Sequence, residues 1–174
     1  GTAQAVGDFT YSNLTLSGSG AKTTTGATVN AILSMEGTAS TTGTVATYGG
    51  AATLQYKGTP AQTTGTEFPA TFNGSGGVII NNSNGVTLGA GKTISRLTLT
   101  SGILATSGAN LLSVSGTATT AISGGSSTSF INGPVRWTLP SSLGSGSTYN
   151  YPVGKGSTYL PFSLVNPTTG AGAV

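Results

Sequence analysis

Residues 83–125 read SNGVTLGAGKTISRLTLTSGILATSGANLLSVSGTATTAISGG. In this stretch an apolar pair or triplet returns about every eight to eleven residues, with glycine-containing turns between the pairs. Short apolar runs bounded by Gly, Ser, Asn or Thr are typical of short β-strands. No window keeps apolar residues at helical spacing for three turns, so helix is not expected. The stretch therefore predicts an internal, imperfect repeat of short strands.

The same order of strand, glycine turn and strand occurs in residues 11–37, YSNLTLSGSGAKTTTGATVNAILSMEG. Each unit is too small to bury its own apolar face, so the units must stack, with Val, Ile and Leu inward and Thr, Ser and Asn toward water. A three-strand coil takes roughly 20 to 25 residues and rises about 4.8 Å, so residues 11–131 predict about five or six coils of an all-β, parallel β-helix-like solenoid. Residues 1–10 are expected to form an N-terminal arm without a coil partner.

Beyond Phe130 prolines recur and aromatic residues gather. Three strand candidates follow, VRWTLP (135–140), STYNYPV (147–153) and YLPFSLV (159–165). Three strands are too few for a closed sandwich. Residues 132–174 therefore predict a small, incomplete β-sandwich-like module with a C-terminal arm, and an open strand edge that recruits a partner.

The composition excludes most catalytic chemistry. Charged residues make up 5% of the 174 residues, and there is no His and no Cys, so His- or Cys-based triads, metal sites and thiol chemistry are excluded. The net charge is +3, but the cations are scattered singly, which argues against a nucleic-acid partner. No segment approaches the roughly 18 apolar residues of a membrane span. The sequence Ala3-Gln4-Ala5 is similar to the end of a cleaved secretion signal, so we expect an exported protein that is not inserted in the membrane.

Two motifs that could carry chemistry have simpler interpretations. Residues 85–93, GVTLGAGKT, miss the phosphate-binding loop pattern by one residue, and a strand follows where that loop needs a helix. A glycosidase needs two carboxylates about 5 to 9 Å apart, and the chain offers Asp8, Glu36 and Glu67. Glu36 precedes a turn glycine and Glu67 lies in a Thr-rich loop, so we interpret both as solvated loop acids. We expect no enzyme activity, no cofactor and no metal site.

Three segments carry a resemblance to a known family: SRLTLTSGILATSGANLLSVSG (95–116), SSTSFINGPVRWTLP (126–140) and YPVGKGSTYLPFSLVN (151–166). Their order resembles the Gly/Thr/Ser-rich repeat segments of large secreted surface proteins of Bacteroidetes-type bacteria, including gliding adhesins and type IX secretion cargo. The resemblance implies an extracellular, non-enzymatic stalk or fibre, and it implies no catalytic or ligand-binding residues.

These observations predict an extracellular structural protein, a subunit of a self-associating surface filament or adhesive appendage. Its partners are identical subunits, held by strand pairing and by solenoid stacking, with residues 1–10 and 167–174 as candidate exchanged arms. The candidate interface residues are Val6, Phe9, Trp137, Tyr149, Tyr151, Tyr159, Phe162 and Val174. The alternative is a segment of a longer adhesin that binds surface glycans through its C-terminal aromatic residues, or ice through Thr-rich strand faces.

Overall fold

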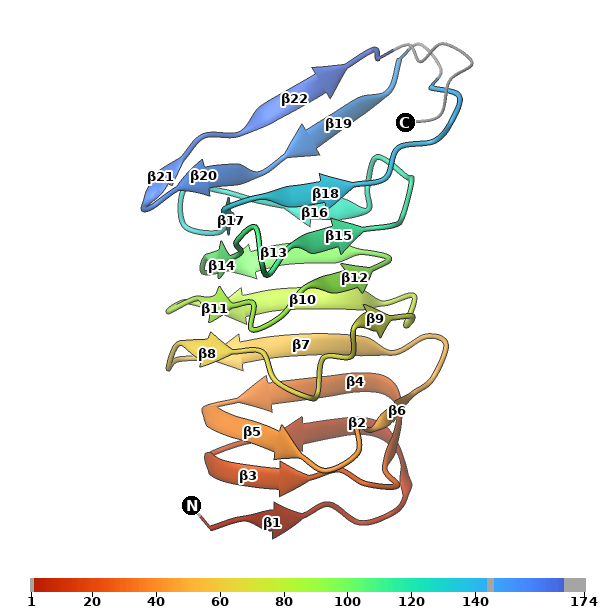
Figure 1. Cartoon of the computed structure of the whole chain (residues 1–174), viewed down its shortest axis with the longest axis vertical. Coiled ribbons are helices and arrows are strands. Elements are labelled where there is room, and N and C mark those ends of the chain that lie inside the picture. Colours follow the sequence, from red (N-terminus) through yellow and green to blue (C-terminus); the bar gives the residue numbers. More distant parts are fainter. Residues whose placement is uncertain (1, 144–145, 168–174) are drawn as a thin grey trace.

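The computed structural model describes residues 2–143 and 146–167, and parallel strands stack there into a β-solenoid with no helix (Figure 1). This confirms the all-β solenoid predicted from the sequence. The stack makes about seven turns, more than the five or six expected, because parallel pairing continues on both sides of residues 11–131. β1 lies at one end of the rod and β22 at the other (Figure 1).

One sheet runs along most of the rod, and we call it the long sheet. Its strands pair in parallel in the order β2-β4-β7-β10-β13-β16, and β6 also pairs with β4. The strands are β2 (Thr10–Leu16), β4 (Thr28–Glu36), β6 (Thr47–Tyr48), β7 (Thr53–Gly58), β10 (Gly77–Asn82), β13 (Leu97–Ser101) and β16 (Ile122–Gly124).

Two further sheets complete each turn from the third turn onward. The second sheet runs β8-β11-β14-β17-β20-β21, and the third sheet runs β9-β12-β15-β18. The strands of the second sheet are β8 (Gln62–Thr63), β11 (Val86–Thr87), β14 (Leu104–Ala105), β17 (Ile131–Asn132), β20 (Val153–Lys155) and β21 (Thr158–Tyr159). Those of the third are β9 (Thr71–Phe72), β12 (Lys92–Ile94), β15 (Leu112–Val114) and β18 (Val135–Trp137).

The first two turns are built differently. After the long sheet the chain returns directly through β3 (Ser19–Thr23) or β5 (Thr38–Thr42), and a single residue, Gly37, separates β4 from β5. These strands and β1 (Gln4–Ala5) form the N-terminal sheet, in the order β1-β3-β5. The N-terminal sheet ends at β5, and the second and third sheets begin at β8 and β9. We call this junction between turns two and three the seam.

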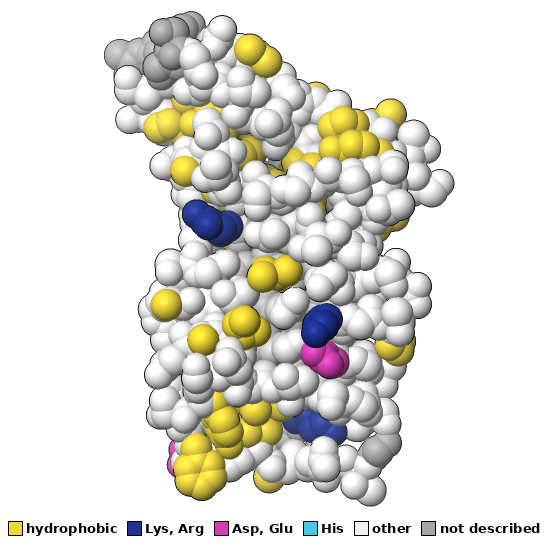
Figure 2. All heavy atoms as spheres, turned by 180° about the vertical axis from the view of Figure 1, so that it is seen from behind, with side chains coloured by type: hydrophobic (Ala, Val, Ile, Leu, Met, Phe, Trp, Pro, Cys, Tyr) yellow, Lys and Arg dark blue, Asp and Glu magenta, His cyan; other side chains and the backbone are white. Residues whose placement is uncertain are grey.

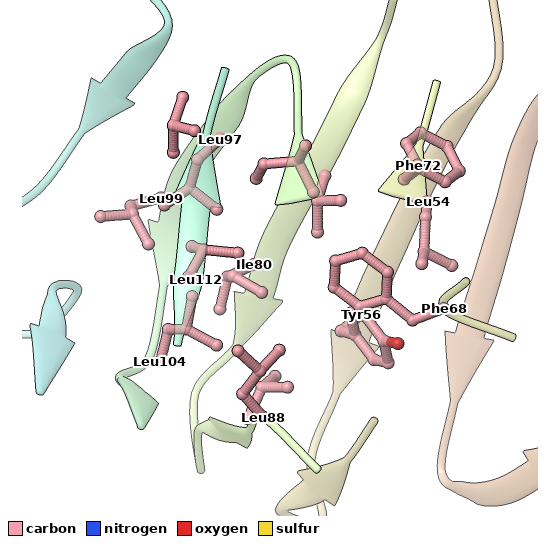
Figure 3. Packing of buried hydrophobic residues seen from close by; sticks show 14 of the residues in the cluster. Leu54, Tyr56, Phe68, Phe72, Ile80, Leu88, Leu97, Leu99, Leu104 and Leu112 are labelled. Carbon is pink, nitrogen blue, oxygen red and sulfur yellow. The ribbon is translucent and has the colours of Figure 1, made fainter. Parts of the chain in front are cut away.

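The core consists of apolar columns that follow the strand register. In the long sheet one register holds, turn after turn, Leu14, Leu33, Leu54, Val78, Leu97 and Ile122. In the third sheet the corresponding column is Phe72, Ile94, Val114 and Trp137. Figure 3 shows members of these columns meeting in the interior. The period-2 alternation of the sequence therefore lines up from turn to turn and gives one continuous core.

Both ends differ from the sequence expectation. Gln4 and Ala5 pair in parallel with Lys22 and Thr23, so the segment expected to lack a coil partner has one. The reason is that the edge of β3 offers unpaired backbone groups, which β1 satisfies. At the other end β18 and β20 continue the third and second sheets, so the parallel stack extends past the boundary expected at residue 131.

After β18 the described chain forms two antiparallel pairs. β19 (Thr148–Tyr151) pairs with β22 (Phe162–Val165), and β20 pairs with β21. The strand candidates at 135–140, 147–153 and 159–165 are confirmed, since β18, β19 and β22 lie within them. We call the β19–β22 pair the terminal hairpin.

Candidate functional site

A buried carboxylate lies at the seam. Glu67 is 2% exposed, and its carboxylate accepts hydrogen bonds from the Tyr56 hydroxyl (2.7 Å), the Thr41 hydroxyl (2.9 Å) and the Gly65 N–H (2.7 Å). Thr41 belongs to β5 and Tyr56 to β7, so the acid joins turn two to turn three. The interpretation of Glu67 as a solvated loop acid is wrong, because the loop folds inward where backbone pairing between the sheets is interrupted.

Burial and this carboxylate change the acidity of two tyrosines. Burial raises the pKa of Tyr56 well above 10, and the negative charge of Glu67 and the hydrogen bond to it add to the effect. Burial also raises the pKa of Tyr48, whose hydroxyl donates to the Glu67 carbonyl oxygen (2.5 Å). Partial burial lowers the pKa of Lys92, and the charge of Glu67 opposes that shift. Tyr48 and Tyr56 therefore stay protonated in the folded protein up to a higher pH than in the unfolded chain.

A cavity of about 230 Å³ lies beside Glu67. It is lined by residues of β5, β7 and β8, among them Thr38, Tyr56 and Gln62. Gln62 donates to the Met35 carbonyl (2.9 Å) and accepts from the Asn82 amide (2.7 Å), so buried amides connect turns two, three and four. The polar groups around Glu67 and Gln62 are satisfied by hydrogen bonds to one another and to the backbone. We therefore interpret this cluster as a structural fastening that holds the turns together at the seam.

At the C-terminal end an aromatic cluster joins the terminal hairpin to the solenoid. The ring centroids of Tyr149 and Tyr151 lie 5.1 and 5.2 Å from that of Trp137. The Trp137 indole N–H donates to the Gly116 carbonyl (2.8 Å), and the Tyr149 hydroxyl donates to the Thr117 carbonyl (3.0 Å). Both residues are buried within the chain. Of the predicted interface aromatics, these two hold the terminal hairpin on the last solenoid turn.

The far strand of the terminal hairpin is apolar and exposed. Phe162 is 55% exposed and Val165 60%, and Leu164 and the neighbouring Leu160 are also exposed. Phe162 stacks on Tyr151, with ring centroids 4.5 Å apart and an interplanar angle of 8°. Sequence reasoning selected Phe162 but missed Leu160, Leu164 and Val165. The run YLPFSLV signals a strand, but not which of its residues stay uncovered.

The N-terminal end also exposes apolar groups. Phe9 is 69% exposed and Val6 is partly buried. A cavity of about 260 Å³ between β1 and β2 is lined by Val6, Leu14 and Leu16, among others. Lys22 at this cavity is 6% exposed, and its ammonium donates to the Gln4 side chain (2.7 Å) and the Ser19 carbonyl (3.2 Å). Figure 2 shows hydrophobic side chains gathered near both ends of the molecule.

The remaining predicted interface residues are Tyr159 and Val174. Tyr159 is half-buried, with its ring centroid 5.7 Å from that of Phe130. Val174 lies outside the described residues, and so does the candidate arm from residue 168 onward. Glu36 pairs with Lys57 (3.8 Å) at the end of β4, and Asp8 is exposed near the N-terminal end. In residues 2–143 and 146–167, no cluster of three His, Cys, Asp or Glu side chains suited to a metal ion occurs.

Two surfaces relate to the alternative binding functions. The outward ladder of the long sheet reads Thr15, Ser34, Gln55, Ile79, Thr98 and Ser123, which is not a regular threonine array. A shallow hollow of about 320 Å³ beside Arg96 is lined mainly by Ser, Thr, Asn and Ala. The glycan alternative concerns the C-terminal aromatic residues, of which Trp137 and Tyr149 are buried and Tyr151 and Tyr159 are partly exposed.

The fold defines the class of the chain as a parallel β-solenoid, and this architecture fits a structural or adhesive repeat protein. Comparison with protein-family models, with curated proteins and with solved structures finds no match. Within the described residues, no helix is long and apolar enough to cross a bilayer.

Proposed function

We propose that this chain is an extracellular structural protein, a subunit of a self-associating surface filament or adhesive appendage. The observation that carries the proposal is the terminal hairpin, whose outer strand β22 is apolar and exposed at one end of the rod. Of the six large hydrophobic side chains exposed in the described residues, Leu160, Phe162, Leu164 and Val165 lie together here. Apolar groups gathered in this way mark interaction sites.

The body of the rod supports a mechanical function. Backbone pairing along the long sheet joins six turns, and apolar columns fill the interior. With 5% charged residues, copies that approach one another meet little electrostatic repulsion. A rod of this kind transmits load along its axis through many parallel ladders and needs no ligand to do so.

Self-association is tested on the purified chain. We expect sedimentation velocity at rising concentration to show growing oligomers, and negative-stain electron microscopy to show filaments about as wide as one rod. A chain that stays monomeric at about millimolar concentration contradicts the proposal. The extracellular location is tested separately by treating intact cells with protease, which removes a surface protein and spares an internal one.

A further inference from the structure

Among the residues that the structure describes, the apolar interior of the rod is only partly covered at its C-terminal end. In the terminal hairpin Tyr149 pairs with Leu164 and Tyr151 with Phe162, so these four side chains share one face. Trp137 covers the tyrosines, but Phe162 and Leu164 remain 55% and 36% exposed. The long sheet ends at β16, so no strand of that sheet pairs at the level of β22. The inner face of β22 therefore extends beyond the sheets that would enclose it.

The N-terminal end has the opposite shape. The apolar columns begin with Leu14 and Leu16 of β2, which border the cavity of about 260 Å³. Ala5 and Val6 line the same cavity from the side of β1. Phe9, the most exposed large hydrophobic residue in the described chain at 69%, lies in the connection between β1 and β2. The N-terminal end of the rod therefore carries a hollow, whereas the C-terminal end carries the projecting strand β22.

Strand edges and charges match in the same way. Within the described residues β1 pairs only with β3, β2 only with β4 and β22 only with β19, so each end of the rod has a strand edge available for addition. Asp8 is exposed at the N-terminal end, where the cation Lys22 is buried and donates hydrogen bonds within the chain, and Lys155 is exposed at the C-terminal end. A contact between unlike ends brings opposite charges together, whereas a contact between two C-terminal ends brings Lys155 near Lys155 and leaves the hollow unfilled.

We propose that copies of this chain associate head to tail, with the terminal hairpin of one copy seated on the open N-terminal end of the next. This inference rests on the proposed function and adds the occupant and the polarity of the contact. Phe162 and Leu164 of one copy meet the hollow beside Leu14 and Leu16 of the next, and the apolar columns continue from copy to copy. Since each copy keeps one free end of each kind, the contact propagates into a filament with a direction and does not close.

Two end-blocking variants test the polarity. Phe9→Lys places a positive charge on the N-terminal end, where it repels Lys155 of the next copy, and Phe162→Asp places a negative charge on the terminal hairpin, where it repels Asp8 of the next copy. Head-to-tail association predicts that each variant alone stays monomeric, with self-association weakened by roughly tenfold or more. It also predicts that an equimolar mixture forms a 1:1 dimer that grows no further, because each variant supplies the end that the other lacks. Sedimentation equilibrium measures both outcomes.

Controls separate the possible failures. Thr100→Asp, on an exposed position of β13 in the middle of the rod, should leave association unchanged. Leu160→Asp, at a residue 57% exposed, replaces Phe162→Asp if circular dichroism shows that the latter does not fold. Dimers of Phe9→Lys alone, or a mixture that stays monomeric while the unmodified chain associates, overturn the polarity and leave the proposed function standing. Absence of association in the unmodified chain overturns both.

Discussion

Glu67 shows how one residue is determined by contacts made far along the chain. Its partners Thr41 and Tyr56 lie 26 and 11 residues away, on two different turns. Buried donors that lose their acceptor retain their full desolvation cost. The carboxylate therefore stabilises the seam more than a surface acid could.

The first prediction concerns this carboxylate. We expect Glu67→Ala to lower the free energy of unfolding by about 2 to 4 kcal/mol, because it leaves three donors at the seam unsatisfied. Urea unfolding followed by circular dichroism measures the change. The matched control is Glu36→Ala, which removes a partly exposed carboxylate that lies 3.8 Å from Lys57 and accepts one hydrogen bond from the Ser34 hydroxyl (3.0 Å). It should cost about 1 kcal/mol. Equal losses in the two variants contradict the proposed fastening.

The second prediction concerns alkaline pH. Burial raises the pKa of Tyr48 and of Tyr56 above the value of about 10 that they have in the unfolded chain. Below pH 10 both states keep these protons, so the stabilisation is fully present. Above pH 10 the unfolded chain releases them and the folded chain does not, so the free energy of unfolding falls by about 1.4 kcal/mol per pH unit for each tyrosine. Urea unfolding from pH 8 to 12 should show this slope, and Tyr48→Phe/Tyr56→Phe should reduce it to what remains from Tyr151, whose pKa partial burial also raises.

At the scale of elements, the corners of the turns depend on particular glycines. Gly102, at the corner between β13 and β14, has a φ of +80°, and a Cβ there would lie 1.6 Å from the Asn82 carbonyl oxygen. Gly18 has a similar φ of +75° but open space around it. A substitution at Gly18 therefore measures the cost of the backbone conformation alone. A substitution at Gly102 also measures the cost of crowding against the neighbouring turn.

The third prediction uses this pair. We expect Gly18→Ala to lower the free energy of unfolding by about 1 to 2 kcal/mol, because at this position only the left-handed backbone conformation is unfavourable for alanine. Gly102→Ala should cost clearly more, because the turn below must also move away from the new methyl group. Denaturant midpoints of the two variants and of the unmodified chain give the comparison. If the two substitutions cost the same, crowding between turns does not set the position of Gly102.

The terminal hairpin is the element in which burial and exposure divide most sharply. Tyr149 on β19 is 2% exposed, whereas its cross-strand partner Leu164 on β22 is 36% exposed. The difference comes from position in the stack, because β19 adjoins the last solenoid turn and β22 lies one strand further out (Figure 1).

At the scale of the whole molecule, stability is unevenly distributed. β7, β10 and β13 pair on both sides in the middle of the long sheet, whereas β1 and β22 each pair with one strand at the ends. Opening of an interior strand breaks two ladders, and opening of an end strand breaks one.

The fourth prediction follows from this distribution. In the monomer, backbone amides of β7, β10 and β13 should exchange with deuterium most slowly, and those of β1 and β22 most rapidly. In assembled material the exchange of β1 and β22 should slow by about tenfold or more, while that of the middle strands changes little. Mass spectrometry of peptides from the two samples checks this. Slowing confined to the middle of the rod would place the contact between copies on its sides.

The sequence alone determined that the chain forms short strands that stack into a solenoid. Alternating apolar residues and recurrent glycines are local signals, so runs such as Leu97–Leu99 and Leu112–Val114 fall on strands of the structure. The absence of His and Cys likewise limited the chemistry from composition alone. The tertiary structure decided that Glu67 is buried, that Trp137 and Tyr149 are covered, and that Leu160, Leu164 and Val165 are exposed. Burial of these residues depends on neighbours from other turns. The alternation of side chains along one strand does not indicate which residues of the neighbouring turns lie above and below it.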